Sequence, residues 1–239
     1  MRFDFRKRCP EQPLGRMVAA LWYARGQIPY RRERIAPTGS TVALFIFGPP
    51  IVQIPNNGQA DPVRGRRGIL VGPHDRPAIN QPTGETFALG IVTTPVGCEP
   101  LFGVPPSELR GRAVELDAVW QDAGKLRTAL LKSDNPDQML DRLADHLGRI
   151  SLPESRGLAR SEHAVRLLEE DPTRTIADIA EELGVSHSHL DRQLTRFVGL
   201  TPRALARLLR LQRLLAQIEV TAPIDWAGLA AQFGWYDQS

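Results

Sequence analysis

The chain has 239 residues, a formal net charge of +3, 42% hydrophobic residues and 24% charged residues. This composition excludes a chain that is disordered throughout, and the longest apolar run, residues 42–47, is far shorter than the roughly 20 residues of a membrane span. Cys9 and Cys98 are far apart and form no CxxC pair, which argues against a disulfide framework or a zinc cluster. We therefore expect a cytoplasmic protein of one large or two modest domains that does not enter the membrane.

Turn-forming residues concentrate in the first part of the chain, where residues 1–106 contain 12 of the 20 glycines and 15 of the 20 prolines. Between these turns lie short runs rich in Val, Ile, Phe and Thr, which is typical of β-strands. The runs cover residues 19–24, 41–47, 51–54, 69–72 and 86–94. Short strands at this spacing favour an antiparallel β barrel or sandwich.

A helical pattern replaces the strand pattern from residue 107 onward, and it is clearest after Asn135. Pro136 fits the first position of a helix, and apolar residues then recur at intervals of three and four. This apolar stripe contains Met139, Leu140, Leu143, Leu147 and Ile150. The stripe can pack on the chain's own β domain or form the seam of a dimer, and the sequence favours neither.

Residues 151–156, with Pro153, form the predicted linker because one helical pattern ends before them and another begins after them. We expect an N-terminal β domain with flanking helices over residues 1–150. An all-α domain should cover residues 156–239. The predicted fold class is α+β.

Residues 159–218 predict successive helices arranged as a helix-turn-helix. Thr175 and Ser186 stand where helix N-caps are expected, and Gly184 supplies the tight turn between the two helices. A small residue at the crossing point and apolar residues at helical spacing complete the pattern. The residues that define it are Ala180, Gly184, Ser186, Leu190, Leu194 and Phe197.

The charge changes sign where the second helix of this motif begins. Residues 156–186 contain four arginines and seven acidic residues, whereas residues 187–213 contain six arginines and only Asp191 as an acid. A helical hairpin with a solvated charged face is the alternative, but it does not require such a gradient. Neutralisation of DNA phosphates does require it, and Arg196, Arg203 and Arg207 are the predicted phosphate contacts.

Two runs in this region resemble the AraC/XylS family of transcription regulators. The run IADIAEELGVSHSHLDRQLTRFVGLTPRALARLLRLQRLL, residues 176–215, is similar to the first helix-turn-helix and connecting helix of that family. The run PIDWAGLAAQFGWYDQS, residues 223–239, is similar to the start of its second helix-turn-helix, with Gly234, Trp235, Asp237 and Ser239 in matching positions. Because the chain stops at Ser239, we expect the second helix-turn-helix to be truncated.

The resemblance implies that the recognition helix, residues 186–199, reads bases in a promoter major groove. Ser188, Asp191 and Arg192 fall on base-reading positions, with His187 at the entrance to the helix. Chemically, Arg192 can clasp a guanine and Asp191 can accept from a cytosine amine. Asp191 would repel a phosphate, however, and it can instead pair with Arg192 or Thr195 within the helix.

The front of the chain resembles a cupin-like domain of unknown function that precedes AraC-type DNA-binding domains. Residues 34–47, 70–97 and 101–120 support this resemblance, which implies a domain that senses a small molecule or dimerises. The expected partners are double-stranded promoter DNA, a second copy of the chain in a homodimer, and a small-molecule effector in the β domain. The aromatic candidates for contacting an effector are Trp22, Tyr23, Phe45, Phe47 and Phe87, although strand aromatics more often form core.

An enzyme is the less favoured alternative. His74 is the one histidine in the β part, so a histidine-based metal site is not expected, and no P-loop, GxGxxG, GxSxG or HExxH motif occurs. We expect no catalytic residues, no metal and no cofactor, and we expect Cys98 to be a buried structural thiol rather than a sensor. A further alternative is a truncated regulator that dimerises or binds a ligand without reading DNA.

Overall fold

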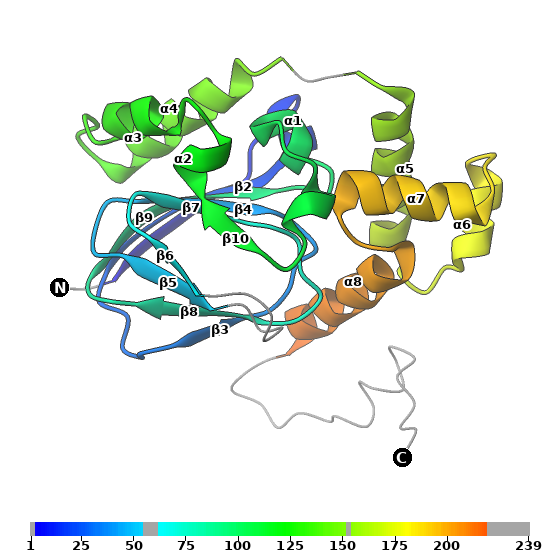
Figure 1. The fold of residues 1–239 in the computed structure, drawn as a ribbon, viewed down its shortest axis with the longest axis horizontal. Helices are drawn as coiled ribbons and strands as arrows, with labels where there is room; N and C mark the ends of the chain where they lie inside the picture. Colours follow the sequence, from blue (N-terminus) through cyan, green and yellow to red (C-terminus); the bar gives the residue numbers. More distant parts are fainter. Residues whose placement is uncertain (1–2, 55–61, 152–153, 219–239) are drawn as a thin grey trace.

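The computed structural model describes residues 3–54, 62–151 and 154–218, which form a β-rich part followed by helices (Figure 1). The strands are β1 (Asp4–Arg8), β2 (Val18–Gly26), β3 (Glu33–Ile35), β4 (Val42–Ile46), β5 (Ile51–Ile54), β6 (Val63–Gly65), β7 (Gly68–Val71), β8 (Ala78–Pro82), β9 (Thr86–Thr93) and β10 (Ala113–Glu115). The α-helices are α1 (Cys98–Phe102), α2 (Leu116–Val119), α3 (Ala123–Leu130), α4 (Pro136–Gly148), α5 (Arg156–Glu170), α6 (Ile176–Glu182), α7 (His187–Val198) and α8 (Pro202–Gln217). Two short 3-10 helices are η1 (Leu14–Arg16) and η2 (Pro106–Leu109).

The strands form two antiparallel sheets. One has six strands in the order β1-β2-β9-β4-β7-β10, and the other has four in the order β3-β8-β5-β6. The predicted α+β class with an N-terminal β sandwich is therefore confirmed, and the five predicted strands correspond to β2, β4, β5, β7 and β9. The sequence did not predict five further strands, because they are short or carry many polar residues. These strands are β1, β3, β6, β8 and β10.

Alternation along the strands gives the six-stranded sheet two different apolar faces. On β2, Leu21 and Tyr23 belong to the main hydrophobic core, whereas Trp22 packs with the smaller cluster on the opposite face. On β4, Phe45 faces the main core, and Leu44 faces the four-stranded sheet. The first face is covered by helices, and the second closes the sandwich.

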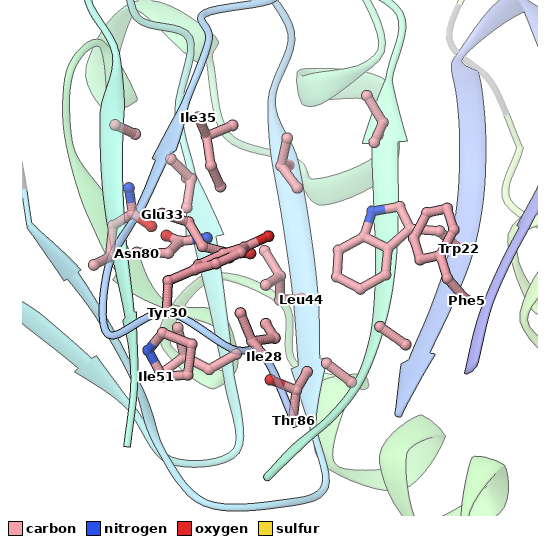
Figure 2. A pocket seen from close by; sticks show the side chains of 18 of the residues that line it. Phe5, Trp22, Ile28, Tyr30, Glu33, Ile35, Leu44, Ile51, Asn80 and Thr86 are labelled. Atoms are coloured by element: carbon pink, nitrogen blue, oxygen red, sulfur yellow. The ribbon is translucent and has the colours of Figure 1, made fainter. Parts of the chain in front are cut away.

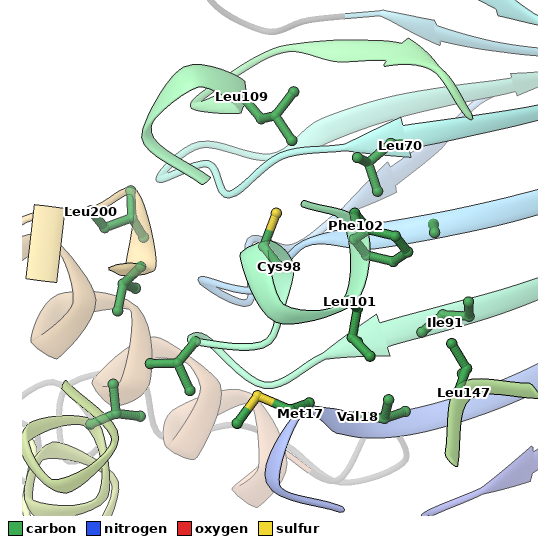
Figure 3. Packing of buried hydrophobic residues seen from close by; sticks show 14 of the residues in the cluster. Met17, Val18, Leu70, Ile91, Cys98, Leu101, Phe102, Leu109, Leu147 and Leu200 are labelled. Carbon is green, nitrogen blue, oxygen red and sulfur yellow. The ribbon is translucent and has the colours of Figure 1, made fainter. Parts of the chain in front are cut away.

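Helix α4 covers the main core with the apolar stripe that the sequence predicted. Asn135 caps the helix by accepting a hydrogen bond from the Gln138 N–H, and Pro136 is its first residue. Leu143 and Leu147 are buried in the cluster that includes Val18 of β2. Figure 3 shows Leu147 beside Val18 and Ile91 in this packing. The stripe is thus used within the chain, which is the first of the two alternatives that the sequence allowed.

The same hydrophobic cluster continues from the β part into the helices, since it includes Leu21 of β2, Leu190 of α7 and Leu205 of α8. A hydrogen bond from Gln212 Nε2 to the Pro37 carbonyl oxygen, 2.6 Å long, joins α8 to the loop after β3. Gly199 ends α7 with φ of +77°, and a Cβ there would lie 2.6 Å from Pro73 Cγ. The helical segment therefore packs directly on the β part.

None of the helices in residues 3–54, 62–151 and 154–218 combines the length and the apolar character that a membrane crossing requires.

Candidate nucleic-acid interface

Helices α6 and α7 form the predicted helix-turn-helix, and local interactions explain each of its boundaries. Thr175 accepts a hydrogen bond from the Asp178 N–H at 3.1 Å, and Ser186 accepts one from the His189 N–H at 3.2 Å. These bonds satisfy backbone donors that the first turn of a helix leaves free. Gly184 adopts φ of +63° in the turn between the helices, a conformation that side chains disfavour. The two predicted caps and the turn glycine are confirmed.

The inner face of α7 is apolar and buried. Leu190, Leu194 and Val198 are fully buried, and Ala180 of α6 is 3% exposed where the two helices meet. Phe197, which the sequence also placed in the motif, is half-buried and packs against the same core. Val198 also faces inward, because the interval of four from Leu194 keeps it on the same face of the helix.

The outer face of α7 presents the side chains predicted to read DNA. Ser188, Arg192 and Arg196 are exposed at intervals of four, so they lie along one stripe of the helix. His187 is exposed at the first helical position, and Asp191 is half-buried beside the stripe. No ion pair joins Asp191 to Arg192 among the described residues, although the sequence allowed one.

His189 lies on a different side of α7 from His187, as their separation of two residues predicts. The Nε2 atom of His189 is 3.2 Å from Arg160 Nη1 of α5. The same Arg160 Nη1 donates to Gln193 Oε1, one turn further along α7, over 3.5 Å. This contact ties the start of α7 to α5. The two histidines therefore do not share a ligand site.

Two more of the predicted phosphate contacts lie on α8. Arg203 and Arg207 are both exposed and one turn apart. Thr201 caps this helix by accepting from the Ala204 N–H, and Pro202 is its first residue. Arg213, near the other end of α8, instead donates hydrogen bonds to the carbonyl oxygens of Glu169 and Glu170. The Arg213 guanidinium is therefore bonded to the end of α5, although the residue is exposed.

Arg196 has a partner that the sequence did not indicate. Its two terminal nitrogens each donate to the Glu99 carboxylate of α1 over 2.5 Å, and its guanidinium lies 5.2 Å from the Phe197 ring centroid. The bonds to Glu99 raise the pKa of the Arg196 guanidinium. Because 97 positions separate Arg196 from Glu99, no local sequence signal could have found this pair. It neutralises one end of the exposed stripe on α7.

A second candidate site is a cavity of about 530 Å³ between the two sheets (Figure 2). Of the five aromatic candidates, Trp22 lines it and points toward it. Tyr23 and Phe45 belong to the main core on the other face of the sheet, and Phe47 and Phe87 pack against that core with their ring centroids 4.9 Å apart. The expectation that most of these aromatics form core is confirmed.

Cys98 and His74 have structural surroundings. Burial raises the pKa of the Cys98 thiol to about 11, and its Sγ donates to the Val104 carbonyl oxygen. This supports the expected buried structural thiol. His74 Nδ1 is 3.0 Å from the Gly72 carbonyl oxygen, and the ring lines the cavity. Among the described residues, no group of three or more His, Cys, Asp or Glu side chains is placed to hold a metal ion.

Comparisons with known proteins match different parts of the chain. Residues 6–115 match a family described as a domain of unknown function (DUF6597), and this segment runs from within β1 to the last residue of β10. A search of curated proteins finds no match.

The solved structures give broader but weaker similarities. ToxT from Vibrio cholerae O395 is 14% identical, with 98% of this chain and 88% of that chain covered and a TM-score of 0.47. ToxT of strain SCE256 with a bound unsaturated fatty acid is 13% identical, with 98% and 86% covered and a TM-score of 0.47. The AraC-like transcriptional activator CuxR is 13% identical, with 90% and 87% covered and a TM-score of 0.31.

The predicted start of a second helix-turn-helix, residues 223–239, lies outside the described residues. So do Gly234, Trp235, Asp237 and Ser239, on which that part of the resemblance rests.

Proposed function

We propose that the chain is a sequence-specific DNA-binding transcription regulator of the cytoplasm that reads a promoter major groove with residues 186–199. The observation that carries this proposal is the exposed stripe of Ser188, Arg192 and Arg196 on the second helix of a capped helix-turn-helix. A major groove admits one α-helix, and the helix enters it with the face that is not packed on its own domain. Because Leu190, Leu194 and Val198 are buried on the inner face of α7, the exposed stripe is the face that is free to enter the groove.

Within the stripe, we assign different roles to its members. Arg192 is positioned to donate two hydrogen bonds to a guanine edge. Ser188 and His187 carry polar groups that can bond neighbouring bases at the start of the helix. Arg203 and Arg207 on α8 supply phosphate contacts, which give affinity without sequence information. Arg196 can join them when it releases Glu99. Asp191, half-buried at the flank, selects a cytosine amine.

The experiment is footprinting of the purified chain on its own genomic DNA, followed by affinity measurement on the protected sequence. We expect a defined protected site and an affinity that falls with salt concentration. Arg192→Ala should cost about 1–3 kcal/mol at one base position and relax specificity there, whereas Arg203→Ala should weaken binding to all sequences and lower the salt slope by about one. The matched control is Arg166→Ala, an exposed arginine on α5 outside the predicted interface.

If Arg192→Ala and Arg166→Ala changed DNA affinity and specificity equally, Arg192 would not be a base-reading residue. Protection that is uniform along the genome would leave only nonspecific binding, and the chain would then not be a sequence-specific regulator.

A second candidate function, a module that dimerises or binds a ligand without reading DNA, is favoured by the cavity between the sheets. The two functions combine if the β domain, residues 1–150, binds an effector and the helical domain, residues 156–239, binds DNA as a homodimer. Sedimentation of the purified chain tests the dimer, because a monomer at all accessible concentrations contradicts it. Stoichiometric binding of a small molecule with no protected DNA would leave the second candidate alone.

A further inference from the structure

The cavity between the sheets has the size and the walls of a small-molecule site. Its volume, about 530 Å³, lies within the roughly 300–1,000 Å³ typical of ligand pockets. The six-stranded sheet contributes an apolar wall that includes Trp22, Leu44 and Val71. Four of the six large hydrophobic residues that are exposed in the described part of the chain also line it: Phe3, Phe5, Tyr30 and Ile35. The site therefore favours a ligand with a hydrophobic body.

The four-stranded sheet places a polar row on the opposite wall. Glu33 of β3 pairs directly with Asn80 of β8, and Asn80 pairs directly with Gln53 of β5. All three side chains line the cavity. The neighbouring inward positions on these strands are apolar and include Ile35 and Ile51. Figure 2 shows Glu33 and Asn80 close together with Tyr30 beside them.

Several polar atoms of this lining have no partner in the described residues. They are Asn80 Oδ1, Thr86 Oγ1 and His74 Nε2, and the Thr86 residue is 6% exposed. Buried polar atoms in native proteins are nearly always hydrogen-bonded, so these atoms indicate a missing partner. A single water occupies only about 30 Å³, and waters bonded to the polar row would leave the apolar side chains of the other wall exposed. A bound molecule that fills the space accounts for both features.

Two of these three atoms require a donor, whereas the Thr86 hydroxyl can either donate or accept. Because a carbonyl oxygen only accepts, His74 donates from Nδ1 to Gly72, and in the neutral ring Nε2 carries a lone pair. Asn80 Oδ1 is also an acceptor. Among the described residues that line the cavity, Glu33 is the one carboxylate, and none is a Lys or Arg. Burial raises the pKa of the Glu33 carboxyl, and a side-chain hydrogen bond with Tyr30 opposes this rise.

We propose that the cavity binds a hydrophobic amine, whose cationic head donates hydrogen bonds to Glu33 and Asn80 while its apolar body lies against Trp22 and Leu44. A carboxylic acid of the same shape finds no cation among the described residues of this lining and faces the Glu33 carboxylate. This proposal names the chemical class of the small-molecule effector, and it rests on the proposed function only in treating the ligand as a regulator of DNA binding. Ligand binding is measured without DNA, so ligand binding and DNA binding can fail separately.

The test compares three probes of one skeleton by titration calorimetry on the full chain: 4-phenylbutylamine, 4-phenylbutan-1-ol and 4-phenylbutanoic acid. We expect the amine to bind about tenfold more tightly than the alcohol and the acid to bind most weakly, because a charge-assisted hydrogen bond is stronger than a neutral one. Glu33→Gln should reduce amine affinity by about tenfold and leave the alcohol within about twofold. Glu170→Gln, an exposed residue of α5, is the control and should change neither affinity.

Ala88→Leu supplies an independent variant, since Ala88 lines the cavity from β9 and the added carbon atoms occupy its space. We expect this variant to lose binding of both amine and alcohol. If Glu33→Gln does not fold, two results still test the proposal. They are the comparison of amine, alcohol and acid on the unaltered chain and the binding by Ala88→Leu. Binding of the acid as tightly as the amine would overturn the proposal, as would binding of none of the three probes or undiminished binding by Ala88→Leu.

Discussion

Arg192 and Arg196 lie one turn apart on α7 in different electrostatic surroundings. Arg192 is exposed and makes no ion pair with the described residues, whereas Arg196 holds the Glu99 carboxylate with two hydrogen bonds. A guanidinium that is neutralised by a carboxylate attracts a phosphate less strongly, and the carboxylate itself repels the phosphate. The ion pair thus competes with the DNA contact that the sequence predicted for Arg196.

Glu99→Gln should therefore strengthen DNA binding. We expect about a three- to fivefold gain in affinity at fixed salt, in line with the roughly 0–1 kcal/mol typical of an exposed ion pair. Glu162→Gln is a matched control, because Glu162 also bridges the helices to the β part, through an ion pair with Arg16 rather than with a residue of α7. A gain of the same size in both variants would attribute the effect to overall charge rather than to release of Arg196.

Cys9 and Cys98 should differ sharply in reactivity. Cys9 is exposed, whereas Cys98 is buried with a thiol pKa raised to about 11, so the reactive thiolate form of Cys98 is rare at pH 8. Alkylation at pH 8 should modify Cys9 within minutes and leave Cys98 intact until urea unfolds the chain. Mass analysis of the Cys9→Ser and Cys98→Ser variants distinguishes the two sites. Rapid alkylation of Cys98 in the folded Cys9→Ser variant would contradict the buried structural role.

Among the secondary-structure elements, α5 to α8 follow the sequence most closely. Each begins at a Ser or Thr whose side chain accepts from a backbone N–H three residues later. This signal is local, so the sequence alone reveals it. The strands behave differently, because β1 with its charged residues and β8 with Asn80 and Gln81 acquire strand structure from pairing with neighbours rather than from their own composition.

Loss of the α7 cap should destabilise the helix-turn-helix. Ser186→Ala removes the acceptor of the His189 N–H, and we expect a decrease of about 1 kcal/mol in the free energy of unfolding. Ser188→Ala is the control, since Ser188 is exposed, lies inside the same helix and makes no cap bond. Urea unfolding measures both. A smaller loss for Ser186→Ala than for Ser188→Ala would mean that the cap does not stabilise the helix.

For the molecule as a whole, the hydrophobic cluster does not stop at the predicted linker. It extends from Leu21 in the six-stranded sheet to Leu190 of α7, Leu205 of α8 and Leu200 between these helices, and Figure 3 shows Leu200 among the side chains of the cluster. Two segments that share one core lose contacts together when either unfolds. The division into residues 1–150 and 156–239 therefore remains a proposal about function, and the shared core has a consequence for stability.

We expect a single cooperative unfolding transition for the helices and the sandwich. Leu205→Ala, at a fully buried position of α8, should lower the free energy of unfolding by about 2–5 kcal/mol. Far-ultraviolet circular dichroism follows the helices. Tryptophan fluorescence follows Trp22 and Trp120, provided that Trp226 and Trp235 are replaced by Phe in every variant compared. The two signals should shift together in Leu205→Ala. A shift of the helical signal alone would contradict a shared cooperative core.

The sequence by itself determined the features that depend on short-range patterns. These are the helix caps at Thr175 and Ser186, the turn at Gly184, the inward stripe of α7 and the strongly apolar strands β2, β4 and β9. Periodicity and capping reveal such features because the interacting residues lie within a few positions of one another.

Only the tertiary structure decided the features that join distant segments. The Glu33–Asn80–Gln53 row exists because β8 lies between β3 and β5 in the sheet, an order that the chain does not follow. The Glu99–Arg196 pair arises because α7 packs against the β part, and the α4 stripe covers β2 because that face of the sheet is apolar. Each depends on the free energy of burying surfaces that only the complete fold brings together.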